Sequence, residues 1–193
     1  IGASSVGQGV ETGMAQICAE LMEIPMDGIT VLHGSTTLLS SGGGTFASRN
    51  TVMAGNAVRV ASEGLKKRCL EIAALRWNES VDALTYAKGG VIRNSGSDSD
   101  FLSLAELTAF DSGDFSEDVD YSNEGSVQFN NGTHYALVEV DPETGEGELY
   151  RHVLSEDVGR SSNPAEVYGQ TAGGRGKGLC GCARDRGFKY DVW

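Results

Sequence analysis

Two glycine-rich loops, each leading directly into a helical pattern, constrain the fold of this chain most strongly. The first loop spans residues 1–10 and the second spans residues 40–50. The chain contains 27 glycines among 193 residues, about twice the usual share of roughly 7%. They follow no collagen period, so they indicate tight turns and places where the backbone closely approaches a neighbour or a ligand.

Apolar residues recur at helical spacing after each loop. The first pattern predicts an amphipathic helix over residues 11–22, which ends at Ile24-Pro25 because proline lacks an amide hydrogen. The second predicts a helix from about residue 51 to residue 76, which is about 39 Å long at roughly 1.5 Å per residue. Its inward face consists of small and aliphatic side chains: Ala54, Ala57, Val58, Ala61, Leu65, Cys69 and Ile72.

Shorter elements fill the rest of the chain. We expect a strand over residues 29–33, a hairpin over 86–93 that turns at Gly89-Gly90, a polar turn over 94–100, a helix over 103–110 and an acidic surface loop over 111–125. Strands over 133–140 and 148–156 should flank a turn at 141–145, and Asn163-Pro164 should open a last helix that runs into glycine-rich residues 169–181. The predicted class is α+β, with long helices packed on small mixed sheets.

Charge and cysteine usage exclude several classes of protein. The formal net charge of −12 argues against nucleic-acid or anionic-membrane partners, which need clustered Lys and Arg. No apolar run approaches the roughly 18 residues of a membrane span. The four cysteines lack zinc or iron–sulfur spacing, which favours a reducing cytoplasm. The chain begins at Ile1 without a signal peptide, and we expect it to be an incomplete piece of a longer protein.

Familiar catalytic patterns are missing from the sequence. The histidines His33, His134 and His152 have no ligand spacing, and a structural role is the simpler reading of each. There is no G-x-S-x-G motif of a serine hydrolase. Residues 173–178 resemble a phosphate-binding loop, but Gly178 stands where Ser or Thr is required. The first loop lacks the preceding strand and the third glycine of a dinucleotide fingerprint.

Local chemistry leaves two interpretations of the glycine loops open. Backbone amides at helix N-termini, together with Arg49 in the second loop, would favour an anionic ligand. Alternatively, the loops are ordinary helix beginnings, with Thr12 and Thr51 near the capping positions.

The order of short motifs along the chain favours the ligand-binding interpretation. In sequence they are Gly7-Gln8-Gly9 with Glu11-Thr12, Gln16-Ile17 with residues 19–21, Ile24-Pro25, residues 33–36, residues 44–49, residues 55–58, residues 104–107, residues 134–145, residues 157–160, Asn163-Pro164, and Gly169-Gln170 with Gly173-Gly174. Together they closely resemble the C-terminal part of the molybdopterin-binding subunit of the xanthine dehydrogenase/aldehyde oxidase family. The resemblance covers residues 1–178, which we expect to form the second half of a molybdopterin-binding domain.

This resemblance implies a molybdenum hydroxylase that oxidises aldehydes, purines, other N-heterocycles or, in one branch, carbon monoxide, with water as the oxygen source. Molybdenum is then held by the cofactor and by no side chain of the protein. By the family pattern, Gln8, flanked by Gly7 and Gly9, hydrogen-bonds near the metal's oxo group. The second loop would surround the pterin and its phosphate through Thr45, Phe46, Ala47, Ser48, Arg49 and Asn50, with Phe46 and Ala47 toward the substrate.

The end of the chain departs from the family pattern. The third glycine stretch usually carries a glutamine near the pterin, and Lys177 stands at that position. A lysine can contact phosphate but cannot replace an amide's paired donor and acceptor. Residues 179–193 form an atypical tail.

The family's general base, a glutamate in a G-x-G-E motif, is expected beyond Trp193. Residues 145–148 match that string, but they lie upstream of Asn163-Pro164, in a hairpin where Gly145 serves the turn and Glu148 starts a solvent-facing strand. This chain alone should therefore bind the cofactor without turnover.

The resemblance also implies partners and leaves alternatives. Iron–sulfur clusters and FAD are expected on partner subunits or domains, and the pterin can carry an appended nucleotide. One alternative, supported by Lys177 and the tail, is a non-catalytic scaffold that keeps the fold without the cofactor. Another is an unrelated α+β binding module.

Overall fold

The structure of this chain is a computed structural model that describes residues 1–39, 41–95, 100–111, 113–123 and 129–182. It divides into two compact units, Ile1–Glu124 and Gly125–Trp193, each of which is described by itself below. Residues 183–193 of the expected tail lie outside the described residues.

The predicted helices of the first unit are confirmed. α1 spans Val10–Met22 and ends where Glu23 takes a left-handed conformation, just before Ile24-Pro25. The long helix begins with a π-helical turn, η2 (Thr51–Gly55), and continues as α2 (Asn56–Trp77). Two short 3-10 turns, η1 (Met26–Gly28) and η3 (Val81–Ala83), complete the helical connections.

A three-stranded antiparallel sheet follows α2, in the order β1 (Leu84–Ala87), β2 (Gly90–Arg93), β3 (Phe101–Ser103). The predicted hairpin is present, but its turn lies at Lys88-Gly89, one residue earlier than expected, where both residues have positive φ. Gly90 instead begins β2 and pairs with Ser103 of β3, and a side chain at Gly90 would collide with the carbonyl oxygen of Leu102.

α3 (Leu104–Phe110) follows β3 directly and begins with a capping box between Ser103 and Glu106. The Ser103 hydroxyl accepts from the Glu106 amide, and the Glu106 carboxylate accepts from the Ser103 amide, so that two otherwise unpaired amides are satisfied. This confirms the predicted helix and turns Leu107 into the core, where it is fully buried.

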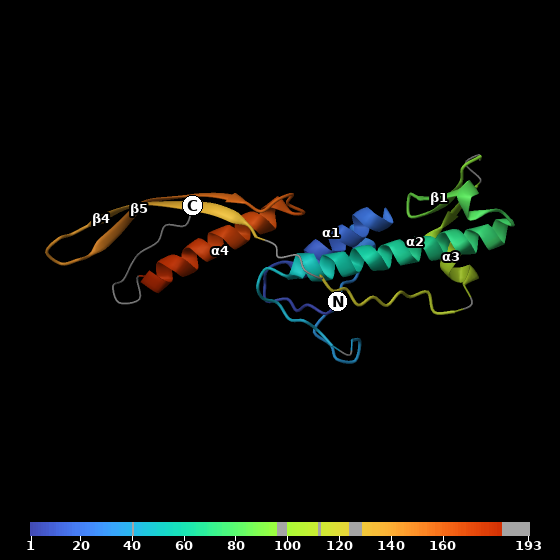
Figure 1. The fold of residues 1–193 in the computed structure, drawn as a ribbon, viewed down its shortest axis with the longest axis horizontal. Helices are drawn as coiled ribbons and strands as arrows, with labels where there is room; N and C mark the ends of the chain where they lie inside the picture. The colour runs from blue at the N-terminus through green and yellow to red at the C-terminus, as the bar shows by residue number, and fades with distance from the viewer. Residues whose placement is uncertain (40, 96–99, 112, 124–128, 183–193) are drawn as a thin grey trace. The chain divides into compact units, whose positions relative to one another are not determined.

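Two hydrophobic clusters lie along α2. One contains Cys69, Ala73, Ala74, Leu84, Val91, Leu102 and Leu107, and joins the C-terminal half of α2 to the sheet and α3. The other contains Ala3, Val10, Met14 and Ala54, and joins the helix start to α1 and the first loop. Figure 1 shows α1 beside the first half of α2, with the sheet and α3 at its other end. The N-terminal end of the long helix therefore packs against the first loop and directly follows the second.

The segment after α3 runs back along α2 (Figure 1). Arg68 on α2 pairs with Asp111 at 2.5 Å and donates to the carbonyl oxygen of Ser116 at 3.4 Å. Glu117 packs so closely on Gly64 that a Cβ at Gly64 would lie 2.7 Å from the Glu117 Oε1 atom. The described part of this acidic segment has no helix or strand, as expected for a loop.

The expected strand at residues 29–33 is wrong. These residues belong to no sheet, although Ile29 has extended φ and ψ angles of −111° and 127°. The Ile1 amine donates to the Leu32 carbonyl oxygen at 2.7 Å. Extended backbone becomes a strand only where a neighbour completes a ladder, and no described segment does so here.

The second unit consists of a long hairpin and one helix. β4 (Asn131–Val140) and β5 (Gly147–Asp157) pair antiparallel, which confirms the predicted hairpin. The pairing has an irregularity between Leu137 and Val138. α4 (Pro164–Cys182) begins where the Asn163 side chain accepts from the amides of Ala165 and Glu166. It continues through the glycine-rich stretch.

The α+β class is confirmed, but in the described parts of the chain both sheets contain antiparallel pairs alone, not the mixed pairing that was expected. Neighbouring strands are joined by tight turns or short links, and such connections reverse the chain direction. Among the described residues, no helix is long and apolar enough to cross a membrane.

Candidate functional site

The first glycine loop presents an unpaired amide. Gly7 and Gly9 have φ angles of 97° and 79°, and Gly9 is the N-cap residue of α1. The side-chain oxygen of Gln8 accepts a hydrogen bond from the Val6 amide at 2.7 Å. Its Nε2 group is buried without a hydrogen-bond partner. A buried, unpaired donor carries a free-energy cost that a ligand acceptor would remove.

The second loop is tightly constrained. Gly44, Ala47 and Ser48 all have positive φ angles, of 69°, 53° and 54°. Ala47 and Ser48 are two successive non-glycine residues with left-handed backbone angles. Such angles store strain, which is frequent at ligand-binding turns. The Arg49 guanidinium donates to the Gly43 carbonyl oxygen at 2.7 Å and stands 5.2 Å from the centre of the Phe46 ring. Within the described residues, no carboxylate forms an ion pair with Arg49.

Thr45 connects the two loops. Its hydroxyl accepts from the Ser4 amide at 3.1 Å and donates to the Ser4 carbonyl oxygen. The Asn50 side-chain amide also donates to this hydroxyl, at 3.2 Å. The side-chain oxygen of Asn50 is left buried without a partner. The structure thus brings Gln8 and the residues 45–50 into one connected pair of loops, through a contact to Ser4 that no sequence motif predicted.

The N-cap positions of these helices are taken by Gly9 and Asn50, not by Thr12 and Thr51. Neither Gly9, the N-cap of α1, nor Asn50, the N-cap of η2, makes a side-chain capping bond. Thr12 and Thr51 lie inside the helical turns instead. The first amides of both helices therefore have no capping side chain at the N-cap.

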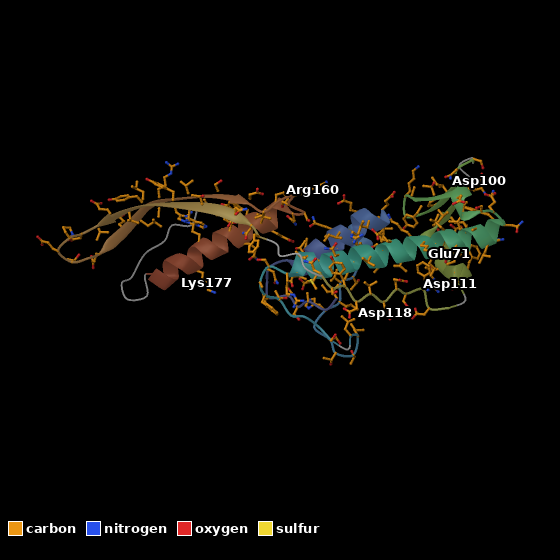
Figure 2. The ribbon with its side chains drawn as sticks, viewed as in Figure 1. Glu71, Asp100, Asp111, Asp118, Arg160 and Lys177 are labelled. Atoms are coloured by element: carbon orange, nitrogen blue, oxygen red, sulfur yellow. The ribbon has the colours of Figure 1, made fainter. Side chains whose placement is uncertain are left out.

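A cavity of about 700 Å³ opens beside the second loop. Gly42, Gly43, Gly44, Arg49 and Asn50 form one wall, and Ala54, Ala57, Val58 and Ala61 form an apolar floor on the helix. Residues 117–121 form another wall, and Figure 2 marks Asp118 on this segment. The acidic wall disfavours an anion in the middle of the cavity, so that an anion gains most on the Arg49 side.

The glycines of this wall leave no room for side chains. A Cβ at Gly42 would lie 2.9 Å from the carbonyl oxygen of Gly2, and one at Gly43 would lie 2.7 Å from the Arg49 guanidinium. The close approach of two backbone segments therefore requires glycine at position 42, whereas a side chain at position 43 would have to displace the Arg49 guanidinium.

Glu11 and His33 form a contact that sequence analysis missed. The His33 Nε2 group and the Glu11 Oε1 atom lie 2.7 Å apart. A bond to its own backbone amide, together with bonds from His33 and Ser5, lowers the pKa of the Glu11 carboxyl. Glu11 could have been noticed as an acidic residue in the first turn of a helix, where a negative charge is favourable. The sequence near Glu11 does not indicate that His33 is its partner.

The remaining predicted residues lie in the second unit. Lys177 is exposed on α4, and its role as a cofactor ligand stays a prediction (Figure 2). Gly145 has a φ of 71° in the turn between β4 and β5, and Glu148 is exposed on β5. His134 and His152 contact one another at 3.3 Å across the hairpin. The described residues contain no group of three or more potential metal ligands.

These loops offer three groups that a ligand could use. Gln8 offers an unpaired donor, Asn50 an unpaired acceptor, and Arg49 a cation that has no carboxylate partner among the described residues. This donor set suits a heterocycle that carries oxo and phosphate oxygens.

Comparison with known proteins agrees with this chemistry. The sequence model of the molybdopterin cofactor-binding domain matches residues 1–186. The chain belongs to this family. This molybdopterin cofactor-binding chain is 33% identical over 200 residues to the 6-hydroxypseudooxynicotine dehydrogenase complex subunit gamma of Paenarthrobacter nicotinovorans, covering 98% of the chain and 25% of that subunit. It is 30% identical over 190 residues to the carbon monoxide dehydrogenase large chain of Afipia carboxidovorans, covering 90% and 22%.

Solved structures give the same answer. The Cu,Mo-CO dehydrogenase in its carbon monoxide reduced state matches with a TM-score of 0.76 at 29% identity, covering 90% of this chain and 22% of that one. Quinoline 2-oxidoreductase from Pseudomonas putida 86 matches with a TM-score of 0.71 at 27% identity, covering 89% and 23%. The molybdopterin-binding chain therefore spans about a quarter of the length of these relatives. The resemblance to the molybdopterin-binding subunit family is confirmed.

Proposed function

We propose that this chain is the cofactor-holding part of a molybdenum hydroxylase that oxidises an aldehyde, a purine or another N-heterocycle, with water as the oxygen source. The bound cofactor would supply the redox chemistry at the substrate carbon. Relatives named for 6-hydroxypseudooxynicotine, nicotine, hypoxanthine and quinoline support an N-heterocyclic substrate.

The observation that carries this proposal is the buried, unpaired Nε2 group of Gln8. Its oxygen is already bonded to the Val6 amide, so the side chain is oriented and only the donor end is free. Such a group is ready to donate to an oxo or carbonyl oxygen without reorganisation.

The second loop would hold the other end of the cofactor. Arg49 and the amides at the start of η2 would bind phosphate, and Ser48 and Asn50 would hydrogen-bond the pterin. Thr45 would act by fixing the two loops to each other, since its hydroxyl is engaged with Ser4 and Asn50. The exposed Phe46 ring, with Ala47, would face the substrate.

We place the general base outside this chain, because Glu148 lies exposed on the β5 hairpin. Residues 1–193 alone would then bind without turnover. Iron–sulfur and FAD subunits would accept the electrons, as relatives named as subunits of complexes support. A cytoplasmic setting is supported by Cys18 and Cys69, which are both free thiols.

The test is the molybdenum content of the full-length gene product that carries this chain, produced with its partner subunits in a host that makes the cofactor. The carbon monoxide dehydrogenase large chain, produced in the same host, is the loading control. We expect about one molybdenum per copy, and turnover of an aldehyde or N-heterocycle. A product without molybdenum, beside a loaded control, would support the non-catalytic scaffold and refute the proposal.

A further inference from the structure

Ala3 and Val10 anchor the two ends of the first loop by packing, but Val6 and Gly7 between them pack against little. Val6 is 77% exposed, and a Cβ placed on Gly7 would meet no atom within 4 Å. Gly7 and Gly9 both have positive φ, a conformation that glycine leaves as readily as it enters. One hydrogen bond, from the Val6 amide to Gln8, lies within the loop itself. The Thr45–Ser4 bonds hold the segment before Gln8, and a contact on the other side of Gln8 would keep its amide aimed.

The Glu11 carboxylate makes the contacts that could do this. It lies three residues after Gln8, in the first turn of α1, and a bond from the Ser5 side chain is one of the causes that lower the pKa of this carboxyl. The same carboxylate accepts from the His33 ring at 2.7 Å. His33 follows Leu32, whose carbonyl oxygen accepts from the Ile1 amine at 2.7 Å.

We propose that Glu11 is a positioning residue: its carboxylate, anchored by His33, fixes the first turn of α1 directly after the loop that carries Gln8. The proposal rests on the function proposed above. Glu11 touches neither substrate nor cofactor in this scheme and acts through the orientation of Gln8. The pair would serve in place of the side-chain cap that α1 lacks.

Exposure argues against a purely structural role in the core. The side chains of Glu11 and His33 are 45% and 25% exposed, so removal of either leaves no large cavity. An exposed pair contributes little to global stability. Loss of the Glu11–His33 pair should therefore change the mobility of the first loop and kcat, and should change the free energy of unfolding little.

The experiment uses the full-length gene product with four substitutions: Glu11→Ala, Glu11→Gln, His33→Ala and His33→Gln. Glu63→Ala is the matched control, because Glu63 pairs with Arg59 at the same 2.7 Å on the exposed face of α2. Three quantities are measured: molybdenum content, kcat and KM with the substrate of the wild type, and deuterium exchange of the peptide that spans residues 5–11 in cofactor-free protein.

We expect Glu11→Ala to lower kcat by about 10- to 100-fold, the scale of a misplaced reacting group, with KM and molybdenum content nearly unchanged. Exchange of the 5–11 peptide should become faster. His33→Ala should act in the same direction. The Gln variants keep a polar partner and should recover part of the loss, while Glu63→Ala should match the wild type in all three measurements.

Unchanged exchange and unchanged kcat in Glu11→Ala would overturn the proposal, as would an equal effect of Glu63→Ala. A wild type without molybdenum would refute the proposed function separately. The exchange data would then still decide whether Glu11 holds the loop.

Discussion

Replacing Gln8 separates cofactor chemistry from protein stability more cleanly than any other change in this chain. In the cofactor-free protein, Gln8→Ala removes the acceptor for the Val6 amide, which is worth about 0.5–1.5 kcal/mol. It also removes the buried, unpaired Nε2 donor, which carries a cost of about 1–3 kcal/mol. The two effects oppose one another, so we expect the free energy of unfolding to change by between about −0.5 and about +2.5 kcal/mol.

In the loaded enzyme the balance is different. There the Nε2 group would donate to an oxygen that gains charge during the reaction, and a hydrogen bond to a charged group is worth about 1.5–3 kcal/mol. Its loss corresponds to a decrease in kcat of about 10- to 150-fold, because each 1.36 kcal/mol is a factor of ten. Molybdenum content should fall less, because Arg49 and the second loop still hold the cofactor.

Gln8→Glu supplies the control within the same site. It keeps the acceptor for the Val6 amide and replaces the donor by a second acceptor, which would repel an oxo group. We therefore expect Gln8→Glu to lower kcat at least as much as Gln8→Ala does. The assay combines metal analysis, steady-state kinetics and chemical denaturation of each variant. Full molybdenum content together with wild-type kcat in both variants would refute the assignment of Gln8 to the cofactor.

Four further outcomes follow from the described contacts. Arg49→Ala should reduce molybdenum content before it reduces the rate per bound metal, because a cation beside an anion contributes mainly affinity; unchanged metal content in purified variants would contradict this. Glu148→Gln should leave kcat within about two-fold, far from the roughly 100-fold loss of a general base, and a loss on that larger scale would restore it as catalytic. Leu107→Ala should lower the free energy of unfolding by about 2–5 kcal/mol, whereas Leu75→Ala, at an 85% exposed position, should change it little; urea denaturation compares the two. Burial raises the pKa of Cys69 from 9.0 to about 11, so the unfolded chain loses this thiol proton at a lower pH than the folded chain does. The free energy of unfolding should therefore fall as pH rises from 9 to 11, and denaturation at several pH values measures it.

Much of the local structure could be predicted from residue patterns. α1, α2 and α3 follow apolar spacing of the kind that creates one buried helix face, and Ser103 with Glu106 forms the capping box that starts α3. The β4–β5 hairpin follows two alternating segments around a turn whose Gly145 takes positive φ. Such features depend on neighbours within a few residues, which the linear sequence contains.

Other features depend on partners that lie far along the chain. Residues 29–33 have β-branched composition but no ladder partner, so a strand expected from composition is absent. Asn50 donates to Thr45 in its own loop, whereas the Thr45–Ser4 contact joins residues 41 apart and no motif spacing encodes it. The Glu11–His33 pair spans 22 residues and was likewise invisible.

By itself, therefore, the sequence determined the family, the helices and the residues of the two glycine loops, because ordered motifs and periodic patterns are local properties of the chain. Only the tertiary structure decided how those loops are used. In the structure, Thr45 joins the two loops, and the Gln8 donor is buried and unpaired. Arg49 pairs with no carboxylate among the described residues, and acidic residues form another wall of the cavity. Whether a polar atom has a partner depends on what the fold brings within about 3 Å of it, and no linear pattern specifies that distance.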